Sequence, residues 1–175
     1  MSWGAAEFVA AEEMGRTRGH WWAPDSGGLL AARVDVSPVS EWWLAAPVDP
    51  VAAPRPFRYP AAGSANAEVR LALVDLSGSV VDVDWRRDEF EYLAAVSWPA
   101  EESGTGSGAG SPTLVVQSRD QKTLAVLTVE VATGATDEVY RVVDDTWVDL
   151  VPGVPRWWPA TWASPNSARC VPSPG

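Results

Sequence analysis

Two adjacent carboxylates, Glu12 and Glu13, are the residues whose type and spacing could do chemistry in this sequence. A glycosidase pair must flank a sugar from two sides, and neighbouring residues do not give that geometry. Two carboxylates projected into one cavity would instead hold an ammonium group through charge-assisted hydrogen bonds. The alternative is a pair of solvated charges on a helix surface. Residues 4–14 are rich in helix formers, so a short helix is expected to carry the pair.

Other reaction chemistries lack the residues they need. A serine hydrolase requires a Ser activated by a His, and His20 is the only histidine. The Gly-x-Ser-x-Gly motif does not occur, even in the Gly/Ser-rich run 103–111. The glycines of residues 104–108 precede neither a lysine nor a helix pattern, which argues against a phosphate-binding loop. We therefore expect no catalytic residue in this chain.

The composition excludes several classes of partner. The 175 residues carry a net charge of -10, which argues against nucleic acid and against an anionic membrane surface. One cysteine, Cys170, and one histidine are too few for a zinc site, so we expect no metal and no cofactor. No segment has the pattern of a signal peptide or a membrane span, and the expected location is the cytoplasm. Lys122 is the only lysine, an arginine bias typical of a GC-rich bacterial coding sequence.

Short apolar runs alternate with turn signals along most of the chain, which indicates an all-β fold. The expected strands are Leu29–Val34, Ser40–Ala45, Glu68–Asp75, Ser79–Trp85, Glu91–Trp98, Thr113–Ser118, Leu124–Val131, Glu138–Val143 and Trp147–Leu150. Two segments interrupt them: Asp49–Pro60, with four prolines, is expected to be a surface excursion, and Glu101–Pro112 a flexible hairpin tip. Residues 159–175 are expected to be an irregular, disordered tail after a domain spanning residues 1–158.

Internal similarity favours a propeller over a sandwich or a barrel. A Trp-Pro turn signal recurs at residues 22–25, 98–99 and 158–159, and a strand end followed by a Gly turn recurs at residues 74–78 and 129–134. Four-stranded blades take about 40–50 residues each, so the chain has room for about three. The 11 tryptophans fit packing within and between blades, and stacking against sugars is the alternative function for them.

The order of several motifs resembles the N-terminal β-propeller of the dipeptidyl peptidase IV family, over about residues 7–158. The resemblance begins with Glu12-Glu13-Met14-Gly15-Arg16 and Gly19-His20-Trp21-Trp22-Ala23-Pro24-Asp25. The blocks that follow in the same order are Ala32–Asp35 with Ser37–Val39, Tyr59–Gly63 with Asn66 and Val69, Val74–Leu76, Gln117–Gln121, Val129 with Ala132–Gly134, and Trp147-Val148.

The resemblance implies a fold and a role for the acidic pair. In that family an eight-bladed propeller caps an α/β-hydrolase domain that carries a Ser-Asp-His triad. A double-Glu motif on a short helical excursion grips the free N-terminal amine of a peptide substrate, so that cleavage falls after its second residue. By resemblance, Glu12 and Glu13 bind that amine.

Two functions of different class are compatible with these features. The first is the non-catalytic propeller portion of a serine peptidase, which gates the cavity and binds the substrate amine while a hydrolase domain, missing from this sequence, performs catalysis. The second is a stand-alone protein-interaction module. About three blades out of eight would leave blade faces open, so self-association through those faces is also expected.

Overall fold

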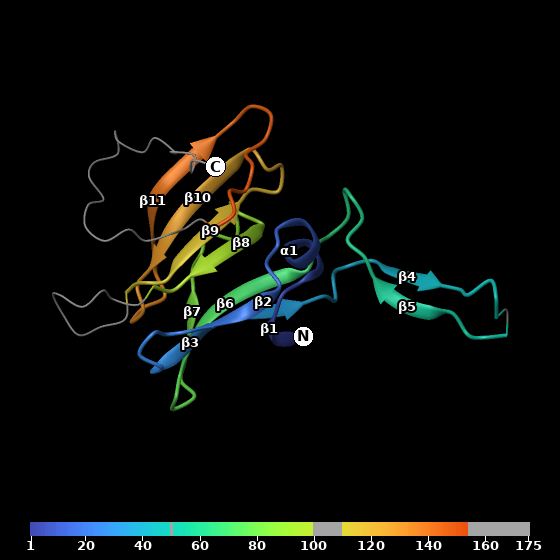
Figure 1. Ribbon diagram of the computed structural model, residues 1–175, viewed down its shortest axis with the longest axis horizontal. Coiled ribbons are helices and arrows are strands. Elements are labelled where there is room, and N and C mark those ends of the chain that lie inside the picture. The colour runs from blue at the N-terminus through green and yellow to red at the C-terminus, as the bar shows by residue number, and fades with distance from the viewer. Residues whose placement is uncertain (50, 100–109, 154–175) are drawn as a thin grey trace, which may run out of the picture.

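The computed structural model describes residues 1–49, 51–99 and 110–153, and these are mostly antiparallel β-structure (Figure 1). One short helix, α1 (Phe8–Glu13), lies between the first two strands. The strands are β1 (Ser2–Ala5), β2 (Arg18–Trp22), β3 (Gly28–Asp35), β4 (Glu41–Leu44), β5 (Arg55–Arg58), β6 (Glu68–Asp75), β7 (Val80–Val83), β8 (Tyr92–Ser97), β9 (Thr113–Gln117), β10 (Thr123–Val129) and β11 (Thr136–Val143). The expected all-β class and the short N-terminal helical excursion are both confirmed.

In the described ranges the strands form three sheets. Five strands pair in the order β1-β2-β3-β6-β7, four in the order β11-β10-β9-β8, and β4 pairs with β5 alone. In the four-stranded sheet every strand pairs with its neighbour in the chain, which is the meander of a propeller blade. Figure 1 shows the two larger sheets side by side and the β4–β5 ribbon extending away from them.

The main hydrophobic core lies between the two larger sheets. Along β6 the side chains of Val69, Leu71 and Leu73 alternate with polar or smaller neighbours, and the inward set is buried. Leu114 and Val116 of β9 bury against the same core. The connection from β7 to β8 adds two large aromatic side chains, Trp85 and Phe90, both almost fully buried. Because successive side chains of a strand point to opposite faces of its sheet, each of the two sheets turns one face toward this core.

Polar contacts join the two sheets at one end of that core. The turn before β11 places Gly134 at a φ of 74°, and its carbonyl accepts a hydrogen bond from the backbone N–H of Asp84 at 2.9 Å. A Cβ on Gly134 would meet the carbonyl oxygen of Asp82 well inside van der Waals contact, so only glycine fits. The hydroxyl of Thr136 donates to the Asp84 carbonyl at 2.7 Å. The turn between β10 and β11 is therefore fixed by the neighbouring sheet.

The β4–β5 ribbon accounts for the proline-rich excursion. All residues of both strands are exposed, as expected for Asp49–Pro60, but β5 itself was not predicted because prolines disfavour strands. Pro56 pairs opposite Trp43 in this isolated two-stranded ribbon. The base of the ribbon is attached to the body by Arg58, whose Nη1 donates to the Val39 carbonyl at 2.6 Å.

The expected strand at Trp147–Leu150 is wrong. Strands β9 and β10 are each paired on both sides, so no free edge remains beside them for another strand. The segment instead crosses the end of the β9–β10 hairpin. The Val148 N–H donates to the Gln121 carbonyl at 2.7 Å, and Gln117 Nε2 donates to the Val148 carbonyl at 2.7 Å.

Among the described tryptophans, Trp98 is half-buried against the main core and the others divide into buried and exposed groups, so packing explains only part of their number. Trp21 and Trp85 are buried. The exposed ones are Trp3, Trp22, Trp42, Trp43 and Trp147. Most of the predicted hairpin tip (101–109) and the whole predicted tail (159–175), with the domain boundary at residue 158, lie outside the described residues. No helix in the described part is long and apolar enough to cross a membrane.

Candidate functional site

The helix that carries the acidic pair is held at both ends by its own sequence. Glu7 is its N-cap, and the Glu7 carboxylate accepts hydrogen bonds from the backbone N–H groups of Val9 at 2.6 Å and Ala10 at 2.9 Å. After Met14 the chain leaves the helix through Gly15, whose φ of 68° is readily reached by glycine. The six-residue helix therefore has Glu12 and Glu13 in its last turn.

The helix is anchored to the body while the two carboxylates stay exposed. Ala10 is completely buried where α1 lies against β8. The ring of Phe8 meets the ring of Tyr59 edge to face, with centroids 5.2 Å apart. Among the described residues, none forms a hydrogen bond or an ion pair with the side chain of Glu12 or Glu13. The predicted pair is thus presented together, exposed and without a partner in the described part of the chain.

A buried arginine connects this helix to both larger sheets. Arg16 is only 6% exposed, and its Nε donates to the carbonyl of Leu93 in β8 at 2.8 Å. Its Nη1 donates to the carbonyl of Arg18 in β2 at 3.1 Å, and its Nη2 lies 3.5 Å from Oε1 of Glu7. Burial lowers the pKa of Arg16, whereas the nearby charge of Glu7 raises it. An arginine stays protonated in spite of such a shift, so the pair is a buried ion pair.

Strand β8 has an irregularity where Arg16 contacts it. Leu93 pairs opposite Val116 and Ala95 opposite Val115, so Ala94 is an extra residue in the ladder. Such a bulge changes the local direction of a strand and disturbs its hydrogen-bond ladder. The Leu93 carbonyl that accepts from Arg16 belongs to this bulge. The bulge and the arginine together fix the position of α1 relative to the four-stranded sheet.

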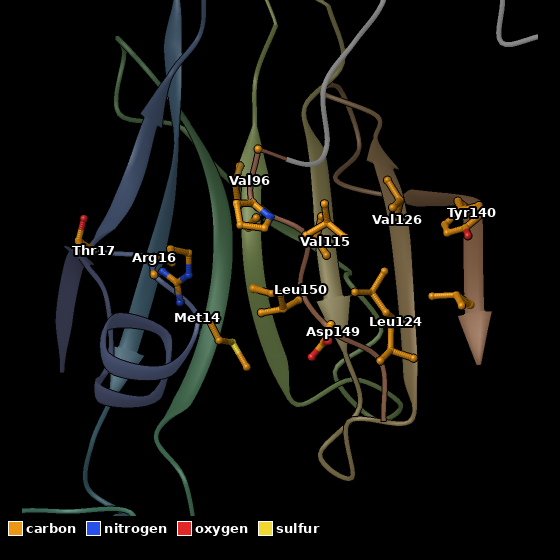
Figure 2. Close-up of a pocket in the computed structure, with 18 of the residues that line it drawn as sticks. Met14, Arg16, Thr17, Val96, Val115, Leu124, Val126, Tyr140, Asp149 and Leu150 are labelled. Atoms are coloured by element: carbon orange, nitrogen blue, oxygen red, sulfur yellow. The ribbon is translucent and has the colours of Figure 1, made fainter. Parts of the chain in front are cut away.

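A groove of about 640 Å³ adjoins the end of the helix (Figure 2). Met14, Arg16 and Thr17 line one side of it, and Leu150 and the segment around it line another. Its floor is the face of the four-stranded sheet that points away from the main core. The apolar side chains of that floor are Ala94, Val115, Leu124 and Val126. Val148 and Leu150, from the chain that follows β11, pack against these buried side chains.

No catalytic constellation is present in the described residues. His20 is exposed, and its Nδ1 lies 3.1 Å from the carbonyl oxygen of Gly4, a contact between β2 and β1. No group of three or more His, Cys, Asp or Glu side chains comes together as a metal site in residues 1–49, 51–99 and 110–153. The only chemistry supported by the geometry around α1 is the binding of a cationic group by the exposed carboxylates.

The chain is similar in sequence to a family of known proteins. A family model of the dipeptidyl peptidase IV N-terminal region matches residues 1–169. The chain belongs to the dipeptidyl peptidase IV family. Mouse dipeptidyl peptidase 8 is 28% identical over 177 aligned residues, which cover 87% of this chain and 18% of that protein. The rat protein named inactive dipeptidyl peptidase 10 is 28% identical and is also covered over 18% of its length. The chain therefore spans about a fifth of the length of these relatives.

A solved structure confirms the fold. Porphyromonas gingivalis dipeptidyl peptidase 4 matches 84% of this chain and 20% of its own chain, with a TM-score of 0.67 at 22% identity. The two larger sheets are accordingly part of the propeller of a dipeptidyl peptidase IV-like N-terminal region.

Sequence reasoning identified the acidic pair but missed the residues that support it. Arg16 was noted only as part of the motif after Glu13, and Glu7 only as a helix former. Nothing local shows that Arg16 is buried, because its Nε acceptor, the carbonyl of Leu93, lies 77 residues away in the chain. The sequence signal for the Arg16–Glu7 ion pair is that the two residues flank a short helix. This signal can be used only once the bounds of the helix are known.

Proposed function

We propose that this chain is the substrate-selecting part of a dipeptidyl peptidase IV-like serine peptidase. Glu12 and Glu13 bind the free N-terminal amine of a peptide, and the propeller segment gates access to the cavity. Catalysis is performed by an α/β-hydrolase domain that supplies the Ser-Asp-His triad. We expect no such activity from this chain by itself, because its sequence has one histidine and no Gly-x-Ser-x-Gly motif.

One observation carries the proposal: the two carboxylates are exposed, without a partner among the described residues, on a helix that a buried alanine and a buried ion pair hold in place. Surface charges that only aid solubility do not need a helix fixed by a buried ion pair and a buried alanine. A primary ammonium group has three donors and can bond both carboxylates at once.

Binding of a dipeptide tests the proposal. Isotope-labelled chain is titrated with Ala-Pro and, separately, with N-acetyl-Ala-Pro, and the NMR shifts of residues 10–17 are followed. The free amine should cause saturable shifts that the acetylated peptide does not cause. Glu12→Gln/Glu13→Gln should abolish them. Asp144→Asn/Asp145→Asn removes the same charge from another exposed adjacent pair and should leave them unchanged. Equal shifts with both peptides would refute amine binding.

A second candidate, an interaction module that self-associates, is favoured by the apolar groove. The groove lies on the side of the four-stranded sheet that points away from the main core, and its lining includes the exposed apolar side chain of Val151. We propose that a second copy of this chain can occupy it. Val151→Glu, at an exposed residue of the groove, should then reduce the molar mass measured by light scattering across a dilution series. A chain that is monomeric at every concentration would exclude this candidate.

A further inference from the structure

The three side-chain contacts of Arg16 converge beside the helix that carries the acidic pair. Its guanidinium joins the N-cap residue Glu7, the carbonyl of Arg18 in β2 and the carbonyl of Leu93 in β8. The backbone N–H of Arg16 also donates to the carbonyl of Ala10 at 2.9 Å. One residue thus connects the start and the end of α1 to both larger sheets.

Besides the contacts of Arg16, two side chains of α1 anchor the helix to the body. Ala10 supplies one small buried side chain, and the Phe8–Tyr59 contact involves an aromatic ring at each side that is more than a third exposed. An isolated helix of six residues is not stable in water, since its nucleation is unfavourable. The direction of Glu12 and Glu13 therefore depends on the polar contacts of Arg16.

The polar contacts also form one connected set. The Glu7 carboxylate caps α1 through Val9 and Ala10, and its Oε1 also faces Arg16. The side chains of Arg16 and Glu7 are 4% and 8% exposed, so neither charge is satisfied by bulk water. Loss of the arginine would leave the Glu7 carboxylate buried without its counter-charge, and the cap itself would be disturbed.

We propose that Arg16 is a positioning residue for the double-glutamate site, fixing α1 and thereby the direction of Glu12 and Glu13 against strand β8. The inference rests on the proposed function of the two glutamates. Arg16 does not touch the substrate; it acts through the helix. Because Leu93 belongs to the four-stranded sheet, the position of the site is set by the packing of two sheets rather than by the helix sequence.

Amide hydrogen exchange, measured on the whole chain, tests whether Arg16 stabilises the position of α1. Arg16→Met should accelerate amide exchange in residues 7–16 by about 10- to 100-fold, the ratio for loss of one hydrogen bond to a charged group. Strands β9 and β10 should change much less. Arg16→Lys keeps the charge and a single donor group, and should restore part of the protection. Leu127→Ala, a substitution in the main core on β10, should lower the protection of β10 without this specific effect on residues 7–16.

The outcomes separate this inference from the proposed function. If Arg16→Met does not fold, Glu7→Gln removes the ion pair together with one of the two cap hydrogen bonds, because the amide nitrogen cannot accept, and should produce an acceleration confined to residues 7–16. Normal exchange of α1 in a folded Arg16→Met chain would overturn the role of Arg16, as would equal acceleration of α1 in Leu127→Ala. Weaker Ala-Pro binding by folded Arg16→Met supports the role. No amine-dependent binding by the unmodified chain would overturn the proposed function itself, and with it any positioning of substrate.

Discussion

Arg86 and Glu138 connect the two larger sheets, with 2.8 Å between Nη1 of Arg86 and Oε2 of Glu138. Arg141 contacts the same glutamate at 2.7 Å and reaches Glu89 at 2.6 Å. The guanidinium of Arg141 also lies over the ring of Phe90, 5.4 Å from its centroid. Glu138 is thus shared by two arginines at the edge of the main core. The contacts form a network, which contributes more to stability than an isolated surface pair.

This network predicts a dependence of stability on pH. The hydrogen bond from Arg141, followed by the charges of Arg141 and Arg86, lowers the pKa of Glu138 from its ordinary value of 4.5. A lowered carboxyl pKa in the folded state stabilises the fold above pH 4.5, and that contribution disappears as the pH falls through the lowered value. Glu138→Gln should therefore cost about 1 kcal/mol at pH 7 and progressively less toward pH 3.

Urea unfolding at both pH values measures this difference. Glu68→Gln, a change at an exposed carboxylate of β6, is the control and should show little effect at either pH. A cost for Glu138→Gln that is the same at pH 7 and pH 3 would contradict the network.

The turn at Gly134 predicts a large effect of a single methyl group. Gly134→Ala adds the cost of a positive φ, about 1–2 kcal/mol, to a steric conflict with the carbonyl of Asp82. Gly78→Ala is a matched control, because Gly78 has a φ of 88° and no heavy atom within 4 Å of the added Cβ. We expect Gly134→Ala to lower the free energy of unfolding clearly more than Gly78→Ala. Equal losses of unfolding free energy in the two variants would show that the backbone at the junction of the two sheets can shift to accept the methyl group.

The β4–β5 ribbon is expected to be dispensable for folding. Its strands pair only with each other, and their residues are exposed. Replacing residues 41–57 by a short Gly-Ser linker keeps Arg58, which attaches the base of the ribbon to Val39. The melting temperature should change little, since the main core is untouched. A loss of cooperative melting would mean that the ribbon contributes to the core after all.

The acidic pair itself should be neutral for stability. Glu12 and Glu13 are exposed and have no side-chain partner among the described residues, so Glu12→Gln/Glu13→Gln should shift the free energy of unfolding by less than about 0.5 kcal/mol. Urea unfolding followed by tryptophan fluorescence measures this value. A loss as large as that of Arg16→Met would show that the pair serves the fold rather than a ligand.

The sequence pattern predicted those strands in which alternating apolar residues face the core. The expected bounds of the strand at Glu68–Asp75 match β6, because its alternating apolar residues face the core between the two sheets. The prediction failed at Trp147–Leu150, since the apolar pattern cannot show that β9 and β10 have no free edge. It also missed β5, where an isolated ribbon accepts a proline that a central strand would not.

The candidate site, like the strands, was predicted in part from the sequence. The adjacent carboxylates and their helix follow from the sequence, and the amine-binding role follows from the resemblance to the family. The buried position of Arg16 could not be predicted, because its acceptor at Leu93 is brought near only when the second sheet packs on the first. A tertiary contact of this range leaves no periodic signal in the sequence.

The extra residue Ala94 in β8 gives this region of the protein an unusual sensitivity to insertions and deletions. Removing Ala94 would leave a regular ladder, with Leu93 still opposite Val116 and Ala95 opposite Val115, and the bulge with its local change of strand direction would disappear. The Leu93 carbonyl would then leave its place beside Arg16. A change in the length of β8, with no change in the sequence of α1, would in this way redirect the carboxylates of Glu12 and Glu13. Length variation in β8 among relatives is therefore a route by which the orientation of the acidic pair could diverge while both glutamates are retained.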